Sequence, residues 1–308
     1  MNVDVLANYP RWTTYLFIAA PVFAIIMVVV ILLKGLKNGI AGLLELIRRL
    51  RSESKISNDE CRISSSVADP RYDNPFFDAI FSGKNATVKH LLSLGIIDVN
   101  IYDNVYDGKM TGLQHAAAAG NEDLVQHLME HGANVNAAAW HHLGRTALEA
   151  ASEGGHLAVV DRLLEKGANV NATADEETTA LEEASGGGHL AVVNRLLEKG
   201  ANVNAEVGEG CGSTALQAAS RGGHLAVVNR LLEKGANINA KAARHYGRTA
   251  LQAASEGGHL AVVDRLLEKG ANINAEAARH YRRTALQAEW EGGHLAVVER
   301  LRRAGATR

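Results

Sequence analysis

Histidine recurs at a regular spacing in the C-terminal half of this 308-residue chain. Imidazole side chains bind metal ions and transfer protons, and five of them recur within copies of the string GGHLAVV. They are His156, His189, His224, His259 and His294. A metal site needs three or four ligands in one place, whereas these residues stand one to a copy, 33 to 35 residues apart. We therefore predict that each of them makes a recurring structural hydrogen bond.

The other candidates for chemistry lack the partners that they would need. His141 and His142 are adjacent, but no third metal ligand is close to them in the sequence. Cys61 and Cys211 are too far apart to form a metal-binding pair, and Cys211 has no neighbouring base. Residues 208–212 are rich in glycine but have neither phosphate-loop spacing nor a preceding strand. We expect no catalytic site, metal, cofactor or small-molecule substrate.

The charge balance argues against a nucleic-acid partner. Residues 71–308 carry 24 basic and 28 acidic side chains, a net charge of −4. A surface of that sign repels a phosphate backbone, so we expect no nucleic-acid binding.

A long apolar segment lies near the N-terminus. Residues 12–33 contain no charge, and as a helix they would be about 33 Å long, enough for a hydrocarbon core of about 30 Å. A cleaved signal peptide would have a shorter apolar core and a basic start. A buried soluble helix is the other alternative, but the polar residues downstream offer it no apolar cover. We predict a transmembrane helix over 12–33, preceded by a short non-cytosolic segment, 1–11.

The residues after this segment are basic and then polar. Five positive charges follow it before residue 52, against Arg11 alone before it, so the positive-inside rule places the C-terminal side in the cytosol. Residues 34–51 have apolar residues at helical spacing between basic ones, which predicts an amphipathic helix in the membrane interface. Packing of that helix on the downstream domain or on a partner is the alternative. Residues 52–71 are aperiodic and predict a flexible linker.

The remainder, residues 72–308, consists of about seven similar units. In the third unit, Thr146 can cap a short helix of small residues, and two glycines follow at residues 154–155. Apolar residues at helical spacing then predict a second helix from Leu157 to Leu164, which Gly167 ends. Each unit therefore predicts a helix, a tight turn, an antiparallel helix and a loop. Such a pair buries its apolar face only by stacking on its neighbours, so we predict an all-α solenoid.

The repeated pattern G-R-T-A-L-x-x-A-x-x-G-G-H-L-x-V-V-x-x-L-L-x-x-G-A-N-V-N-A resembles the ankyrin repeat. It departs from the family at the helix-opening T-P-L-H, where this chain has residues such as Thr249-Ala250-Leu251-Gln252. The departure removes a rigid first turn and an imidazole, which we expect to lower the stability of each repeat without changing the fold. The resemblance implies protein partners bound by the loops between repeats, the fingers, which line a concave face.

The finger loops are the segments that differ most from one unit to the next. Several contain arginine or aromatic residues, the types that are enriched at interface hot spots. The candidate partner-binding residues in the loops are Trp140, His141, His142, Arg244, His245, Tyr246, Arg279, His280 and Tyr281, with Arg221 and Trp290 on the adjoining surface of the first helices. Drift in unconstrained loops is the alternative explanation.

These observations predict a single-pass membrane protein whose ankyrin-like array faces the cytosol. Its expected function is that of a scaffold or adaptor for protein partners, with residues 12–51 in contact with membrane lipid. A lumenal or extracellular display protein, an array without a selected partner and, least favoured, an enzyme are the alternatives.

Overall fold

The computed structural model describes residues 74–307, with gaps at 96, 104–108, 139–144, 175–177, 206–212, 242–247, 276–283 and 288–292. The chain divides into two compact units, Met1–Ala68 and Asp69–Arg308, and every described residue belongs to the second. The predicted transmembrane helix over 12–33, the amphipathic helix over 34–51 and the linker over 52–71 lie outside the described residues. Among the described helices, none has the length and apolar character needed to cross a bilayer.

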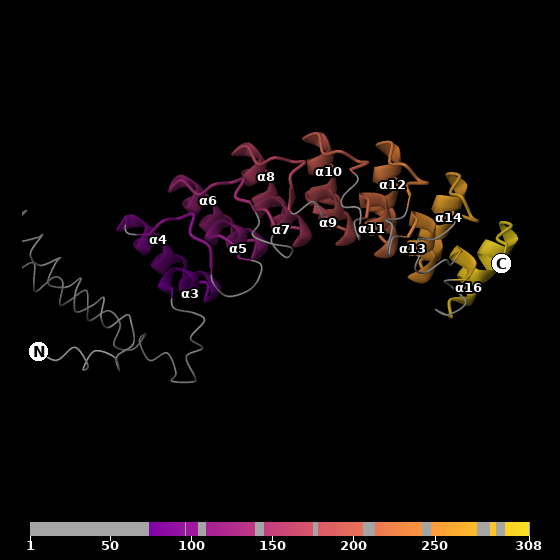
Figure 1. Cartoon of the computed structure of the whole chain (residues 1–308), viewed down its shortest axis with the longest axis horizontal. Coiled ribbons are helices and arrows are strands. Elements are labelled where there is room, and N and C mark those ends of the chain that lie inside the picture. The colour runs from indigo at the N-terminus through magenta and orange to yellow at the C-terminus, as the bar shows by residue number, and fades with distance from the viewer. Residues whose placement is uncertain are drawn as a thin grey trace, which may run out of the picture. The chain divides into compact units, whose positions relative to one another are not determined.

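The described part of the second unit is a row of helix pairs arranged in two layers (Figure 1). The inner layer comprises α3 (Pro75–Phe81), α5 (Gly112–Ala118), α7 (Ala147–Glu153), α9 (Ala180–Gly186), α11 (Ala215–Arg221) and α13 (Ala250–Glu256). The outer layer comprises α4 (Asn85–Ser93), α6 (Glu122–Glu130), α8 (Leu157–Glu165), α10 (Leu190–Glu198), α12 (Leu225–Glu233), α14 (Leu260–Glu268) and α16 (Leu295–Arg303). Helices of one layer pack on the next helix of the same layer, so the predicted helical solenoid is confirmed.

The inner helices from α5 to α13 are capped by a threonine, as the sequence predicts. Thr146 Oγ1 accepts a hydrogen bond from the Glu149 backbone N–H at 3.2 Å, and Glu149 Oε2 accepts one from the Thr146 N–H at 2.9 Å. This reciprocal arrangement is a capping box, and it recurs at α5, α11 and α13 with glutamine as the second partner. The glutamate or glutamine therefore restores a hydrogen bond at the turn where the sequence departs from T-P-L-H.

Four of the five repeated histidines, His156, His189, His224 and His259, have the structural role that their spacing predicts. The Nε2–H of His189 donates to the carbonyl of Glu153 at 2.8 Å. Glu153 is the last residue of α7, the inner helix of the previous repeat. Equivalent bonds of 2.9–3.1 Å reach from His156, His224 and His259 to the preceding inner helix. The ring of His189 lies over Gly155, where a Cβ would overlap it, and Gly155 has a φ of +70°. Both conditions demand glycine, which explains the invariant form of the GGH string within this chain.

The core is continuous from one repeat to the next. From α6 onward, each outer helix contributes the same leucine, and these side chains are fully buried: Leu128, Leu163, Leu196, Leu231, Leu266 and Leu301. The first repeat differs from the rest, because the buried Phe76 holds the position of a leucine such as Leu148, and the buried Phe77 holds the position of the capping-box residue, such as Glu149. Asn74 caps its inner helix by accepting a 3.0 Å hydrogen bond from the Phe76 N–H, and Pro75 takes the first helical position.

One small departure from an all-helical structure lies between the third and fourth repeats. The strands β1 (Thr173–Ala174) and β2 (Thr178–Thr179) form an antiparallel hairpin in which Thr173 faces Thr179. A single β-bridge between Tyr102 and Thr111 occupies the corresponding place between the first and second repeats.

Candidate interaction surface

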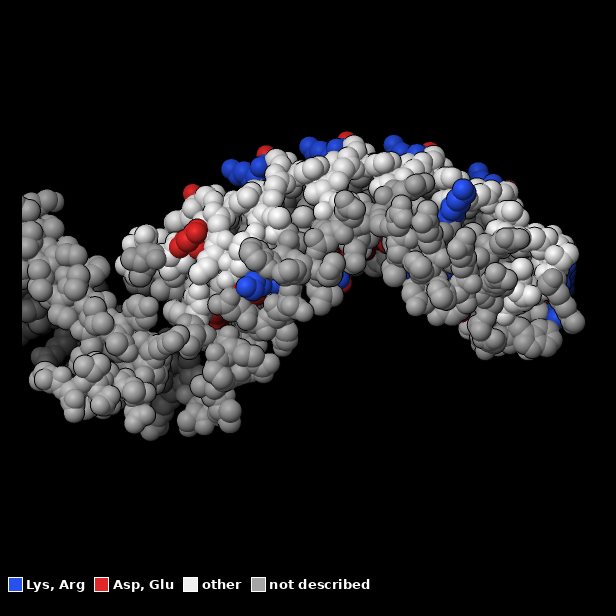
Figure 2. Space-filling view, in the orientation of Figure 1, with Lys and Arg blue, Asp and Glu red and all other residues white. Residues whose placement is uncertain are grey.

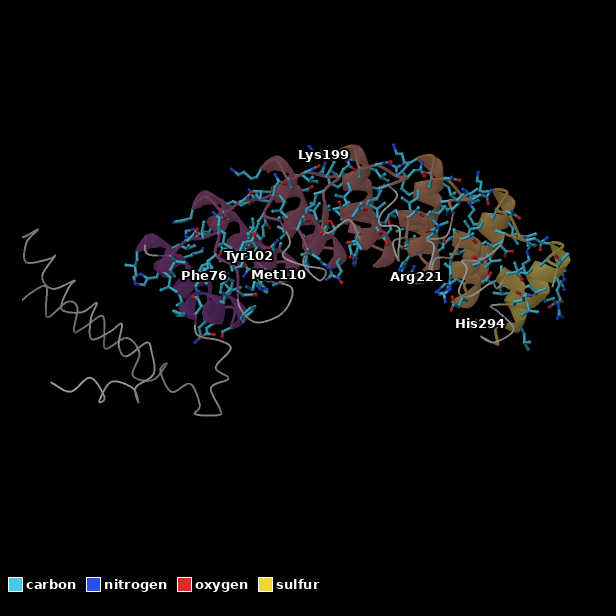
Figure 3. All side chains as sticks on the ribbon, in the orientation of Figure 1. Phe76, Tyr102, Met110, Lys199, Arg221 and His294 are labelled. Atoms are coloured by element: carbon cyan, nitrogen blue, oxygen red, sulfur yellow. The ribbon has the colours of Figure 1, made fainter. Side chains whose placement is uncertain are left out.

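Ten of the eleven predicted partner-binding residues lie outside the described part of the chain. They are Trp140, His141, His142, Arg244, His245, Tyr246, Arg279, His280, Tyr281 and Trp290. The position in the repeat that Trp290 holds is a fully buried serine in four described repeats, for example Ser255. Arg221 is described, and it lies at the end of α11, exposed on the inner side of the array (Figure 3).

The inner face is built from the last residue of each inner helix. These exposed residues are Phe81, Ala118, Glu153, Gly186, Arg221 and Glu256. From Ala118 to Arg221, the backbone carbonyl of each one accepts the histidine bond from the following repeat. The backbone at these positions is therefore held in the same way, while the side chain changes at every repeat. We call this row of six residues the inner-face row.

Two glutamates of the inner-face row are neutralised within their own repeat. Arg145 stands just before the capping threonine of α7, and its Nη1 lies 2.5 Å from Glu153 Oε2. Arg248 has the same place before α13 and forms an ion pair with Glu256. Arg145 also lies 3.6 Å from Glu183 Oε1 in the next repeat. Burial raises the pKa of Glu183, and the nearby Arg145 opposes that rise.

The two central repeats lack this ion pair. Thr178 and Ser213 stand where Arg145 and Arg248 stand in the flanking repeats, and Gly186 and Arg221 replace the glutamates. Among the described residues, the Arg221 guanidinium has no hydrogen-bond or ion-pair partner. Among the described residues, a Cβ built on Gly186 would meet only the Ala218 side chain, at 3.7 Å, so no described side chain fills the space at that position of α9.

A buried carboxyl group lies beneath this central part of the inner face. Glu182 in α9 is 9% exposed, and its Oε1 accepts a hydrogen bond from the Ser213 hydroxyl of the next repeat. Its other oxygen, Oε2, is buried without a described partner. Burial raises the pKa of Glu182 from 4.5 to about 7, and the hydrogen bond from Ser213 and the charge of Arg221 only partly oppose that rise. Glu182 was not among the predicted site residues, because glutamate also stands at this position in the third repeat, as Glu149, and the repeat pattern alone does not distinguish the two.

The N-terminal end of the inner face is aromatic. Phe81 is 45% exposed, and its ring meets the His115 imidazole edge to face, with the ring centroids 4.7 Å apart. His115 Nε2 contacts the carboxylate of the buried Asp103, which also accepts the Met110 N–H at 3.3 Å. The carboxylate thus fixes the orientation of the imidazole against Phe77 and Phe81.

The outer side of the array carries structural ladders. Asn204 illustrates the one along the loops: its Nδ2 donates to the Gly235 carbonyl at 3.1 Å, and its Oδ1 accepts the Asn237 N–H at 2.7 Å. Basic and acidic side chains alternate along the ridge at the C-terminal ends of the outer helices (Figure 2). They include the exposed Glu-Lys pairs at 165–166, 198–199, 233–234 and 268–269, so this ridge repeats one balanced pattern.

No group of described His, Cys, Asp or Glu side chains is placed to hold a metal ion. Cys61, Cys211, His141 and His142 lie outside the described residues.

Comparison with known proteins identifies the class to which this architecture belongs. A family model described as ankyrin repeats (3 copies) matches residues 76–174, 143–207 and 168–242, and a second, ankyrin repeats (many copies), matches residues 221–267. The chain therefore belongs to the ankyrin-repeat family. Among solved structures, it is similar to the crystal structure of the human ASB11 ankyrin repeat domain, with 27% identity and a TM-score of 0.62. That match covers 76% of this chain and 99% of the other. The search of curated proteins found no match.

Proposed function

We propose that this protein is a scaffold or adaptor that binds protein partners through the inner face and finger loops of its ankyrin array. Ankyrin repeats are generally protein–protein interaction modules, and the solenoid offers an extended surface of the kind that repeat proteins use. The observation that carries the proposal is the contrast between the outer and inner sides of the array. The ridge of the outer layer repeats one Glu-Lys pattern, whereas the side chain of the inner-face row changes from each repeat to the next. The backbone of that row is held in the same way from Ala118 to Arg221.

A photo-crosslinking scan of the full chain tests which side binds. A benzophenone amino acid is placed singly at Glu153, Arg221 or Glu256 on the inner face. Matched variants carry the benzophenone amino acid at Lys199 or Lys234 on the outer ridge. Figure 3 shows the position of Lys199. In native membranes, we expect inner-face positions to yield discrete protein adducts and ridge positions to yield none. Adducts at the ridge alone would contradict the proposal.

We also propose that the array is tethered to a membrane by a helix over residues 12–33 and lies on the cytosolic side. The support is the uncharged length of that segment and the excess of basic residues after it. Carbonate washing should leave the full chain in the membrane, while a chain that begins at Asp69 should be released.

Glycosylation tests the orientation. An acceptor tripeptide in an extension before residue 1 should be modified in cells, because the proposal places it on the non-cytosolic side. Asn85-Ala86-Thr87 and Asn171-Ala172-Thr173 are acceptor sequences within the array and should stay unmodified. Glycan on either of them, with none on the extension, would reverse the orientation and favour a display protein.

A further inference from the structure

Arg221 reverses the charge of the inner-face row at its centre. The same position holds Glu153 two repeats earlier and Glu256 one repeat later, and each of these is paired with an arginine of its own repeat. Arg221 has no such partner among the described residues, because Ser213 takes the place that Arg145 and Arg248 hold. A guanidinium is always charged and has five N–H donors in a fork that matches a carboxylate.

The surroundings of Arg221 leave room for a group that is brought by another molecule. Gly186 removes the side chain that would stand beside it in the preceding repeat, and the space there is bounded by the small Ala218. Ser213 is buried, and its hydroxyl hydrogen-bonds to Glu182, with no bond to Arg221. The third and sixth repeats hold neutralised pairs, whereas Arg221 has no ion-pair partner among the described residues.

The charge environment selects the kind of group that would bind. Glu153, Glu183 and Glu256 lie on the same face, and residues 71–308 carry a net charge of −4. A polyanion such as nucleic acid gains affinity from several cations at once and would meet these carboxylates instead. A single carboxylate needs one guanidinium and the open space above Gly186.

We propose that Arg221 binds an aspartate, a glutamate or a C-terminal carboxylate of a protein partner on the central inner face. The inference rests on the proposed scaffold function and specifies the partner's chemistry at one position. Loss of this ion pair should lower affinity about tenfold or more, because hydrogen bonds to charged groups are among the stronger ones in proteins.

A charge-swap experiment tests this proposal with the full chain held in lipid nanodiscs. Random linear peptides displayed on phage are selected on the native protein, and the enriched peptides are synthesised. We expect enrichment of Asp or Glu, affinity at least tenfold weaker for Arg221→Glu, and recovery when the peptide's acidic residue is changed to lysine. Lys234→Glu, an equal charge change on the outer ridge of the same repeat, is the matched control and should leave affinity unchanged.

Melting curves of both variants must match that of the native protein. Selected peptides without acidic enrichment, equal weakening by both variants, or a library that yields no binder would each overturn the proposal. A phosphoserine that binds more tightly than glutamate in the same peptide would also overturn the assignment to a carboxylate. If the peptides bind independently of Arg221 while crosslinked adducts form at the inner face, the proposal for Arg221 is wrong and the proposed scaffold function is retained.

Discussion

At the residue scale, the buried carboxyl of Glu182 makes the stability of the array depend on pH. Its pKa is raised from 4.5 to about 7, chiefly by burial, so the folded protein favours the neutral form. The stability that the neutral form gives is complete below about pH 4.5 and is lost as the pH rises through about 7. Above that pH, a carboxylate with one buried unpartnered oxygen remains in the interface between the fourth and fifth repeats.

We expect Glu182→Gln to stabilise the protein at pH 8 and to have little effect near pH 4.5. The gain at pH 8 should be of the order of 2–3 kcal/mol, since one pKa unit corresponds to about 1.4 kcal/mol. Glutamine occurs here in other repeats, where it also donates to a backbone carbonyl, as Gln252 Nε2 does to Ala275 at 2.9 Å. Urea titrations at the two pH values measure the difference. An equal gain at both would show that ionisation is not the cause.

Ser220 supplies a second prediction at this scale. Its hydroxyl is fully buried without a partner among the described residues, and Ala117 occupies the same position in the second repeat. Ser220→Ala should therefore leave stability unchanged or raise it by up to about 1 kcal/mol, because no hydrogen bond is lost. Ser213→Ala is the contrasting variant: it removes the donor to Glu182 and should destabilise by about 1 kcal/mol. Thermal melting compares them, and a similar loss in both would refute the distinction.

At the element scale, the contact between the outer helices α10 and α12 has polar atoms without hydrogen-bond partners among the described residues, whereas other contacts between outer helices have an ion pair. Arg195 lies 2.5 Å from Asp161, and Arg300 lies 2.5 Å from Asp264, each pair joining adjacent outer helices. The α10–α12 equivalents are Asn194 and Arg230, and both Asn194 Oδ1 and Arg230 Nε are buried without a described partner.

Asn194→Asp should supply the missing carboxylate to Arg230. We expect the melting temperature to rise by about 1–3 °C, because ion pairs of this exposure contribute modestly, and the rise should shrink in high salt. Asn229→Asp provides the control, since Asn229 already accepts a 2.6 Å bond from Arg265 and should gain less. The gain should disappear in the presence of Arg230→Gln. Its persistence there would mean that the two side chains do not interact.

At the scale of the whole array, stability comes from the interfaces between repeats. Leu231 is fully buried in the fifth repeat, within a core that runs unbroken along the described repeats. Leu231→Ala should cost about 2–5 kcal/mol, as large-to-small changes in cores do. Since repeats are coupled to their nearest neighbours, hydrogen exchange should show lost protection in α10 and α14 as well as in α12. Lys234→Ala, three residues away and exposed, should change stability by less than about 0.5 kcal/mol.

Loss of hydrogen-exchange protection in α12 alone would contradict this coupling between repeats. It would mean that each helix pair opens independently, and the solenoid would then behave as a string of separate units. The inner-face row would in that case present no fixed spacing to a partner.

The repeating part of this protein follows from local signals in its sequence. A period of 33 to 35 residues, threonine before a short helix, paired glycines and a recurring histidine are local signals that act within one repeat or between nearest neighbours. They predicted the helix pairs, the capping residues, the buried leucines and the structural role of the imidazoles, because the same local conditions recur in each copy. The same regular spacing argued against a metal site, because it places one histidine in each copy.

Only the tertiary structure decided what the differences between the copies mean. Glu149 and Glu182 hold the same position, yet one completes a capping box and the other meets Ser213 from 31 residues further along the chain. Arg248 finds a glutamate in its own repeat, while Arg221 is left without a described partner. The burial of a charged side chain and its ion pairs depend on which side chains two stacked repeats bring together. The repeat pattern predicts that the repeats stack, but it does not predict the contacts at positions where one copy differs from the others.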